Sequence, residues 1–132
     1  MSDLTATSIH HLSLSVGDAV ETAGWFQQLL GGALVTERMG DGFRRLRLAW
    51  PSGLVLSITQ HDQTDLSDRF DHRRIGMDHF SLACSSKAEI TDWCAHMDER
   101  GIEHGPLEDV AYGWAVTART PDGIPVEFFC AK

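Results

Sequence analysis

The chain has few of the residues that mark secreted or membrane-spanning proteins. Its 132 residues include only three cysteines, four prolines and one tyrosine. An odd number of cysteines without C-x-x-C spacing predicts reduced thiols and not a disulfide framework. No apolar run reaches the roughly 18 residues of a membrane span, and residues 1–7 do not resemble a signal peptide. We therefore expect a cytoplasmic protein that does not enter membranes.

Positive charge is also scarce. Eleven Lys and Arg residues stand against nineteen Asp and Glu residues, which gives a formal net charge of −8. Such a balance disfavours the phosphate backbone of nucleic acids and anionic membranes as main partners, and leaves a small molecule as the expected partner. The length fits one domain that can bury a core without disulfide or metal staples.

The most informative feature that the chain does contain is an internal repeat. The segment His11–Val16 recurs as His79–Cys84, and the turn Pro51–Leu54 recurs as Pro121–Ile124. A repeat on this scale indicates two copies of one supersecondary unit. Each copy carries one histidine at its first repeated position.

Each copy has the pattern of one strand, one helix and three further strands. Asp18 and Glu21 form a capping-box pattern before a helix that Gly31 ends. The expected strands lie near 9–16, 33–38, 43–49, 53–60, 77–84, 103–109, 112–119 and 124–130, with a second helix near 86–100. The sequence thus predicts an α+β fold of two tandem βαβββ modules whose mixed sheets curve around a central cavity. We assign module one to residues 8–60, a linker to 61–75 and module two to 76–130.

Strand periodicity separates the candidate ligands from the core. His11 and His79 fall on the strand faces that point away from the helices, whereas Asp78 falls on the helix side. Glu127 lies in an apolar strand, where a carboxylate is costly to bury without a partner. Alignment of the two repeated turns places Glu127 opposite Ser57 of the first copy.

Two imidazoles and one carboxylate form the ligand set of non-haem Fe(II) oxygenases, and they also suit Mn, Ni or Zn. We therefore predict that His11, His79 and Glu127 bind a divalent metal ion. The alternative is that each histidine is an ordinary solvent-facing or hydrogen-bonded residue. The symmetry of the two histidines, together with an acid in a corresponding strand, favours the metal.

These segments resemble a known family. The paired modules, His11, the segment "GMDHFSLA" around His79 and the segment "TPDGIPVEFF" around Glu127 resemble the vicinal oxygen chelate superfamily over about residues 8–130. This superfamily includes glyoxalases, bleomycin resistance proteins, extradiol dioxygenases and fosfomycin-resistance transferases. The resemblance implies the same three metal ligands and a small oxygen-bearing substrate chelated to the metal. It also implies a homodimer, whose modules pair within one chain or swap between two chains.

The fourth metal position of the family falls on Ser57, which is a poor ligand and is assigned here to substrate binding. This departure weakens the interpretation as a glutathione-dependent isomerase and favours dioxygenase-like or transferase-like chemistry. A rival function is metal-free sequestration of a drug or metabolite, as in bleomycin resistance. Relatives of that kind usually lack the ligands, so their presence favours an enzyme.

Four further residues are candidates for the site. Tyr112 is a candidate hydrogen-bond donor to a metal-bound oxygen, or else a half-buried structural tyrosine. His61 is a candidate ligand or acid–base group, or else a solvated loop residue. Arg45 and Arg47 alternate on one strand face, where they either attract an anionic substrate or simply face solvent.

Overall fold

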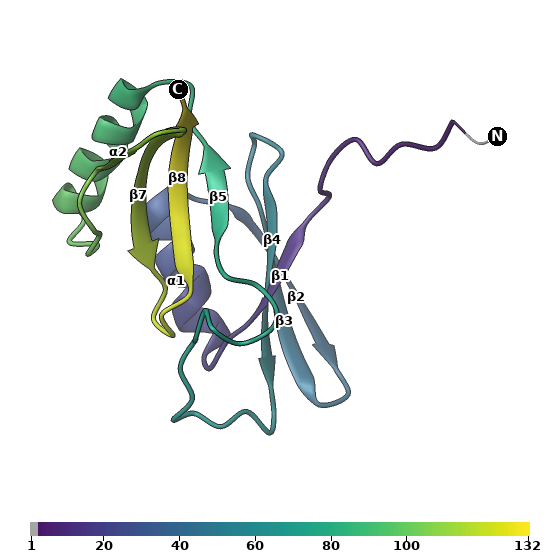
Figure 1. The fold of residues 1–132 in the computed structure, drawn as a ribbon. Coiled ribbons are helices and arrows are strands. Elements are labelled where there is room, and N and C mark those ends of the chain that lie inside the picture. Colours follow the sequence, from purple (N-terminus) through teal and green to yellow (C-terminus); the bar gives the residue numbers. More distant parts are fainter. Residues whose placement is uncertain (1–2) are drawn as a thin grey trace.

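The computed structural model describes residues 3–132, which fold into two consecutive βαβββ units (Figure 1). The first unit contains β1 (Leu12–Ser15), α1 (Ala19–Leu30), β2 (Leu34–Gly40), β3 (Phe43–Ala49) and β4 (Val55–His61). The second contains β5 (Phe80–Ala83), α2 (Lys87–Glu99), β6 (Glu108–Val110), β7 (Gly113–Arg119) and β8 (Pro125–Ala131). The prediction of an α+β fold with two tandem modules is confirmed.

Each unit forms its own four-stranded sheet. The strand orders are β1-β4-β3-β2 and β5-β8-β7-β6. In both sheets the first strand pairs in parallel with the last, and the remaining pairs are antiparallel, so both sheets are mixed. The strands β1 and β5 each have one unpaired edge, because no backbone ladder joins the two sheets in the described chain. The sheets therefore do not close into a barrel.

Both helices begin at the caps that the sequence predicts. The side chain of Asp18 accepts a hydrogen bond from the backbone N–H of Glu21, and Ser86 does the same for Glu89. Glu89 in turn accepts from the backbone N–H of Ser85. Each cap satisfies an N–H group that the helix itself cannot pair, which is worth about 1 kcal/mol. Helix α1 is followed by Gly31, whose φ of 90° suits glycine.

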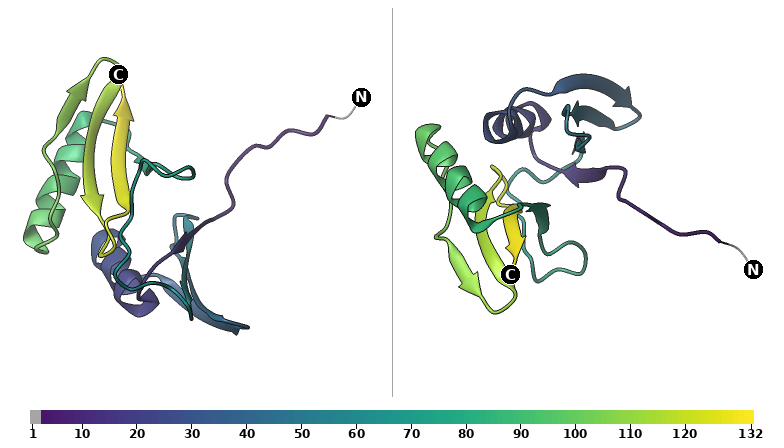
Figure 2. Two further views of the ribbon diagram at one scale, coloured as in Figure 1. Left: turned by 60° about the horizontal axis from the view of Figure 1, so that its bottom comes forward. Right: turned by 90° about the horizontal axis from the view of Figure 1, so that it is seen from above.

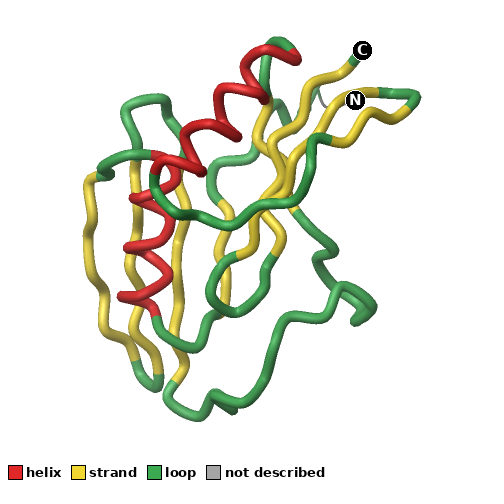
Figure 3. Tube along the Cα trace, turned by 90° about the vertical axis from the view of Figure 1, so that its left-hand side faces the viewer, coloured by secondary structure: helices red, strands yellow, loops and turns green. Residues whose placement is uncertain are grey.

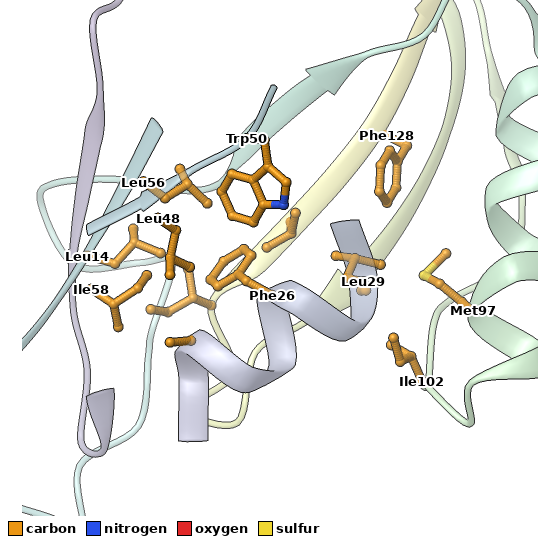
Figure 4. Packing of buried hydrophobic residues seen from close by; sticks show 14 of the residues in the cluster. Leu14, Phe26, Leu29, Leu48, Trp50, Leu56, Ile58, Met97, Ile102 and Phe128 are labelled. Carbon is orange, nitrogen blue, oxygen red and sulfur yellow. The ribbon is translucent and has the colours of Figure 1, made fainter. Parts of the chain in front are cut away.

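One hydrophobic core joins the two units. Phe26 and Leu29 of α1 belong to the same buried cluster as Met97 of α2 and Phe128 of β8 (Figure 4). The ring of His96 on α2 also lies 2.8 Å (Nε2 to O) from the carbonyl oxygen of Leu29. The two helices therefore lie in the angle between the sheets, as the right-hand view of Figure 2 shows. The face of each sheet that bears no helix, here called its open face, points away from this core.

The strand that begins each unit is shorter than predicted. β1 starts at Leu12 and β5 starts at Phe80, so His11 and His79 immediately precede their strands instead of lying within them. The neighbouring His10 is exposed as well. Both candidate histidines thus sit where the chain enters a sheet edge.

The connection between the units contains turns but no helix or strand from residue 62 to residue 79 (Figure 3). Asp122 of the β7–β8 turn holds this connection and the end of β1 together. Its carboxylate accepts from the N–H of Gly17 at 2.9 Å, and its carbonyl accepts from the N–H of Phe70 at 3.0 Å. None of the helices in residues 3–132 has the length and apolar character that crossing a membrane requires.

Candidate metal centre

Two of the three predicted ligands lie together on the open face of the second sheet. Glu127 of β8 is paired in register with Ser81 of β5, whose hydroxyl donates to its Oε1 at 2.5 Å. The Nε2 atom of His79 lies 3.8 Å from the same Oε1. The Glu127 side chain is 19% exposed, so its carboxylate is largely shielded yet still reachable from the open face. This is an imidazole and a carboxylate at a separation that one ion can bridge.

Asp78 orients the imidazole of His79. Its Oδ1 lies 2.6 Å from His79 Nδ1, and this hydrogen bond lowers the pKa of Asp78. Nδ1 of His79 faces the carboxylate of Asp78, while Nε2 lies on the side of Glu127. A carboxylate on the ring nitrogen remote from the metal is the arrangement found around metal-bound histidines. Strand alternation predicts that Asp78 lies on the helix side, but its side chain is 65% exposed because β5 begins only at Phe80. This contact could have been predicted from the sequence, because Asp78 directly precedes His79.

The third predicted ligand lies apart from this pair. His11 is exposed at the start of β1, and its Nδ1 is hydrogen-bonded to Nδ1 of His10 at 2.8 Å. Residues 3–132 contain no group of three or more His, Cys, Asp or Glu side chains close enough to hold a metal ion. A cavity of about 200 Å³ is lined by residues of both modules, among them His11 and Ser81. A single chain thus assembles two of the three candidate ligands.

The substrate-binding candidates lie on the open face of the first sheet. Ser57 is buried in β4 and is paired in register with Ser13 of β1 and with Arg47 of β3. Arg45 lies one pleat further along, and its Nε donates to the hydroxyl of Thr59 at 2.9 Å. The interaction with Thr59 was not predicted, because it depends on the β3–β4 register.

The last two candidates occupy the ends of their sheets. Tyr112 is 71% exposed, and its ring lies 6.0 Å from that of Phe129, which shares the open face with Glu127. Its high exposure does not match the half-buried structural role considered above. His61 is exposed at the end of β4, with its ring 6.4 Å from the ring of Phe43. Four residues of strand, about 13 Å, separate it from Ser57.

The thiols do not add a nucleophile to this region. Burial is the main cause that raises the pKa of Cys84, to about 11, and burial also raises the pKa of Cys94. The thiol form of Cys84 and Cys94 therefore dominates at neutral pH. All three cysteines are free in the structure.

The fold and the His79–Glu127 pair place the chain in a class of α+β proteins. Proteins of this class have two modules and carry side chains of the type that bind metals on an open sheet face. A family model described as the Glyoxalase/Bleomycin resistance protein/Dioxygenase superfamily matches residues 8–128. The chain belongs to this superfamily, and the resemblance seen in the sequence is confirmed. No curated protein matches the chain.

Solved structures share this fold at low sequence identity. A glyoxylase/bleomycin resistance protein/dioxygenase domain from Frankia sp. EAN1pec has a TM-score of 0.86 and 24% identity, and the match covers 97% of this chain and 94% of that one. A mutant of a fosfomycin resistance protein from Listeria monocytogenes, complexed with Mn(II) and 1S,2S-dihydroxypropylphosphonic acid, has a TM-score of 0.67, 14% identity and coverages of 97% and 95%. Lactoylglutathione lyase from Agrobacterium tumefaciens has a TM-score of 0.67, 17% identity and coverages of 95% and 94%.

Proposed function

We propose that the protein is a metal-dependent enzyme that acts on a small oxygen-bearing substrate chelated to a divalent ion. The observation that carries this proposal is the His79–Glu127 pair, with 3.8 Å between Nε2 and Oε1. Fe, Mn, Ni and Zn all accept imidazole and carboxylate ligands. The expected chemistry is dioxygenase-like, glyoxalase-like or transferase-like, as in the superfamily.

The donor atoms present fit such an ion. Asp78 holds His79 through Nδ1 and leaves Nε2 available, and the hydroxyl of Ser81 fixes one oxygen of Glu127. These outer contacts are of the type that orient ligands and increase their basicity. When bound, the metal would polarise substrate oxygens and stabilise negative charge that develops on them. Tyr112, which is exposed beside Phe129, would donate a hydrogen bond to the substrate.

The third ligand, His11, would come from a second copy of the chain. The open faces of the two sheets point away from the shared core, and no three-ligand group forms within residues 3–132. The unpaired edges of β1 and β5 offer backbone groups to a second copy. We therefore propose a homodimer with two metal sites, each built from His79 and Glu127 of one protomer and His11 of its partner. We also propose a cytoplasmic location, where the free thiols remain reduced.

Metal content tests the ligand assignment. Protein purified without chelator and reconstituted with each metal in turn should hold about one ion per chain. Glu127→Ala and His79→Ala should abolish stoichiometric binding, because each removes a ligand. His72→Ala is the matched control, since this histidine is exposed in the connection between the units. Wild-type protein that stays empty with every metal would contradict the proposal and favour a metal-free sequestering protein.

Co-expression tests the sharing of ligands between protomers. His11→Ala and Glu127→Ala chains should each fail to bind metal alone. In a mixed dimer, however, one of the two sites would contain wild-type His11, His79 and Glu127, so about one ion per dimer should return. If all three ligands came from one chain, neither chain would be intact and no metal would return.

A further inference from the structure

The open face of the first sheet carries a concentration of positive charge in an otherwise acidic protein. The β2–β3–β4–β1 register aligns Arg38, Arg45, Thr59 and Ser15 in one row. The adjacent row contains Thr36, Arg47, Ser57 and Ser13. No strand position on this face is Asp or Glu, although the whole chain has a net charge of −8. Three guanidinium groups and a set of hydroxyls thus share one surface.

The arginines on this face lack acidic partners. Among residues 3–132, no ion pair involves Arg38, Arg45 or Arg47. By contrast, Arg44, which projects from the other face of β3, is paired with Glu37 at 2.9 Å. The arginines on the two faces of β3 therefore differ in their electrostatic environment. Arg44 is neutralised by Glu37, whereas Arg45 and Arg47 have no acidic partner and can attract an external anion.

Arg45 has no acidic partner, and its side chain is held in a fixed position. It is half-buried, its Nε donates to Thr59, and its Cζ lies 4.7 Å from the centroid of the Phe43 ring. Within the described chain its two terminal nitrogens have no hydrogen-bond acceptor. A guanidinium whose orientation is fixed and whose terminal N–H groups are free is suited to bind two oxygens of one anion.

The repeat shows that the scaffold does not require these charges. When the two copies are aligned on Ser57 and Glu127, Arg45 corresponds to Ala115 and Arg47 to Thr117, and these occupy the same positions of the β7–β8 ladder. The second sheet forms without a cation at either position. The βαβββ fold therefore does not need Arg45 and Arg47 in order to form, and the two arginines are specific to the open face of the first sheet.

We propose that Arg45 and Arg47, with the hydroxyls of Ser57 and Thr59, bind an oxyanion group of the substrate. The chemical class is a small molecule bearing a carboxylate or a phosphate-type group, with Arg38 adding to the positive potential. This inference rests on the proposed function, because it makes the anion one end of the substrate whose other oxygens reach the metal. The row that contains Arg47 and Ser57 lies two strand residues, about 7 Å, from the position of His11.

The test uses inorganic phosphate and malonate as probes of the full-length protein. The protein is stripped of metal with a chelator and desalted, and each anion is titrated by calorimetry at constant ionic strength. Wild-type protein should bind at least one of the two probes. Arg47→Gln, at an exposed site with no ion pair to lose, should weaken binding about tenfold, as expected for one charge-assisted hydrogen bond. The Arg45→Gln, Arg47→Gln double variant should remove binding.

Arg44→Gln is the matched control, because it removes the same charge from the same strand but from the other face. It should leave the affinity for the probes within about twofold. Binding of phosphate alone would assign a phosphate-type group, and binding of malonate alone would assign a carboxylate. Absence of binding for both probes, or equal weakening by Arg44→Gln and Arg47→Gln, would overturn the proposal.

The outcome is separable from that of the metal proposal. The titration is performed without metal, so anion binding that survives in His79→Ala would support the arginine site even if no ion were ever bound. Conversely, stoichiometric metal without anion binding would leave the metal centre intact and refute the anionic substrate.

Discussion

The two modules share a backbone but differ in the chemistry of their open faces. At corresponding positions of the two ladders, the first face has Arg47 and Ser57 where the second has Thr117 and Glu127. The first face is cationic and rich in hydroxyls, whereas the second carries a carboxylate beside a histidine. The repeated unit therefore supplies two similar sheet faces, and the functions proposed above assign anion binding to the first face and metal binding to the second.

The helices differ in a parallel way. Helix α1 buries five residues, whereas α2 buries two. Helix α1 packs on β3 and β4 of its own sheet, the carbonyl of Leu29 also meets the His96 ring of α2, and the Phe26 ring lies 6.5 Å from that of Phe80 in β5. The two modules contribute almost equally to the shared core, whereas the second module supplies two of the three candidate ligands.

The largest expected effect is the loss of bound metal when Glu127 on the second open face is replaced by serine, the residue at the corresponding position of the first face. Glu127→Ser places the first module's residue at the corresponding position of β8. The variant should lose stoichiometric metal, since serine is a poor ligand. Ser57→Ala, the matched change on the first face, should retain it, as measured by elemental analysis. Equal metal content in the two variants would refute the division of roles.

The next largest effect concerns the shared core. Phe26→Ala should reduce the free energy of unfolding by about 3–5 kcal/mol, because it leaves a cavity at a fully buried site. Val20→Ala on the same helix should change it by less than about 0.5 kcal/mol, since Val20 is exposed. Denaturant titration followed by circular dichroism measures both. Two separate unfolding transitions in the wild type would show that the modules are less coupled than the joint core indicates.

Removal of the carboxylate that orients His79 should have an intermediate effect. Asp78→Asn keeps the size of the side chain but removes its charge, so the affinity for the metal should fall by about 10–100-fold. Competition with a chromophoric chelator gives the dissociation constant. The exposed Asp65→Asn is the comparison variant and should leave the constant unchanged.

The smallest expected effect is a dependence of stability on pH in the second module. The carbonyl of Gly105 and then the carboxylate of Asp98 raise the pKa of His104 above 6.5, since both ring nitrogens face acceptors. Because the folded-state pKa is raised, this stabilisation is fully present below pH 6.5 and is lost as the pH rises through the folded-state value. His104→Gln should flatten this part of the curve of unfolding free energy against pH. If the slope of unfolding free energy against pH were unchanged in His104→Gln, the pH dependence would arise from another titratable group.

Much of the fold could be predicted because its determinants are local. The capping residues Asp18 and Ser86 lie next to the helices that they begin, and the strand faces follow from alternation. The position of His11 could not be predicted in the same way. Periodicity extends the first strand back to residue 9, but a strand exists only where a neighbour pairs with it, and pairing with β4 begins at Leu12. The hydrogen bond from Arg45 to Thr59 could likewise not be predicted without the register of the β3–β4 pair.

The sequence by itself determined the two units, their helix-facing sides and the residues with ligand chemistry, because repetition and periodicity are properties of neighbouring positions along the chain. The tertiary structure decided which of these residues meet. Parallel pairing of β5 with β8 brought His79 close to Glu127. Burial of both helices in one core turned the open faces outward and left His11 at a separate edge. The physical reason is that packing of two sheets depends on the total apolar surface they bury together, which no single segment encodes.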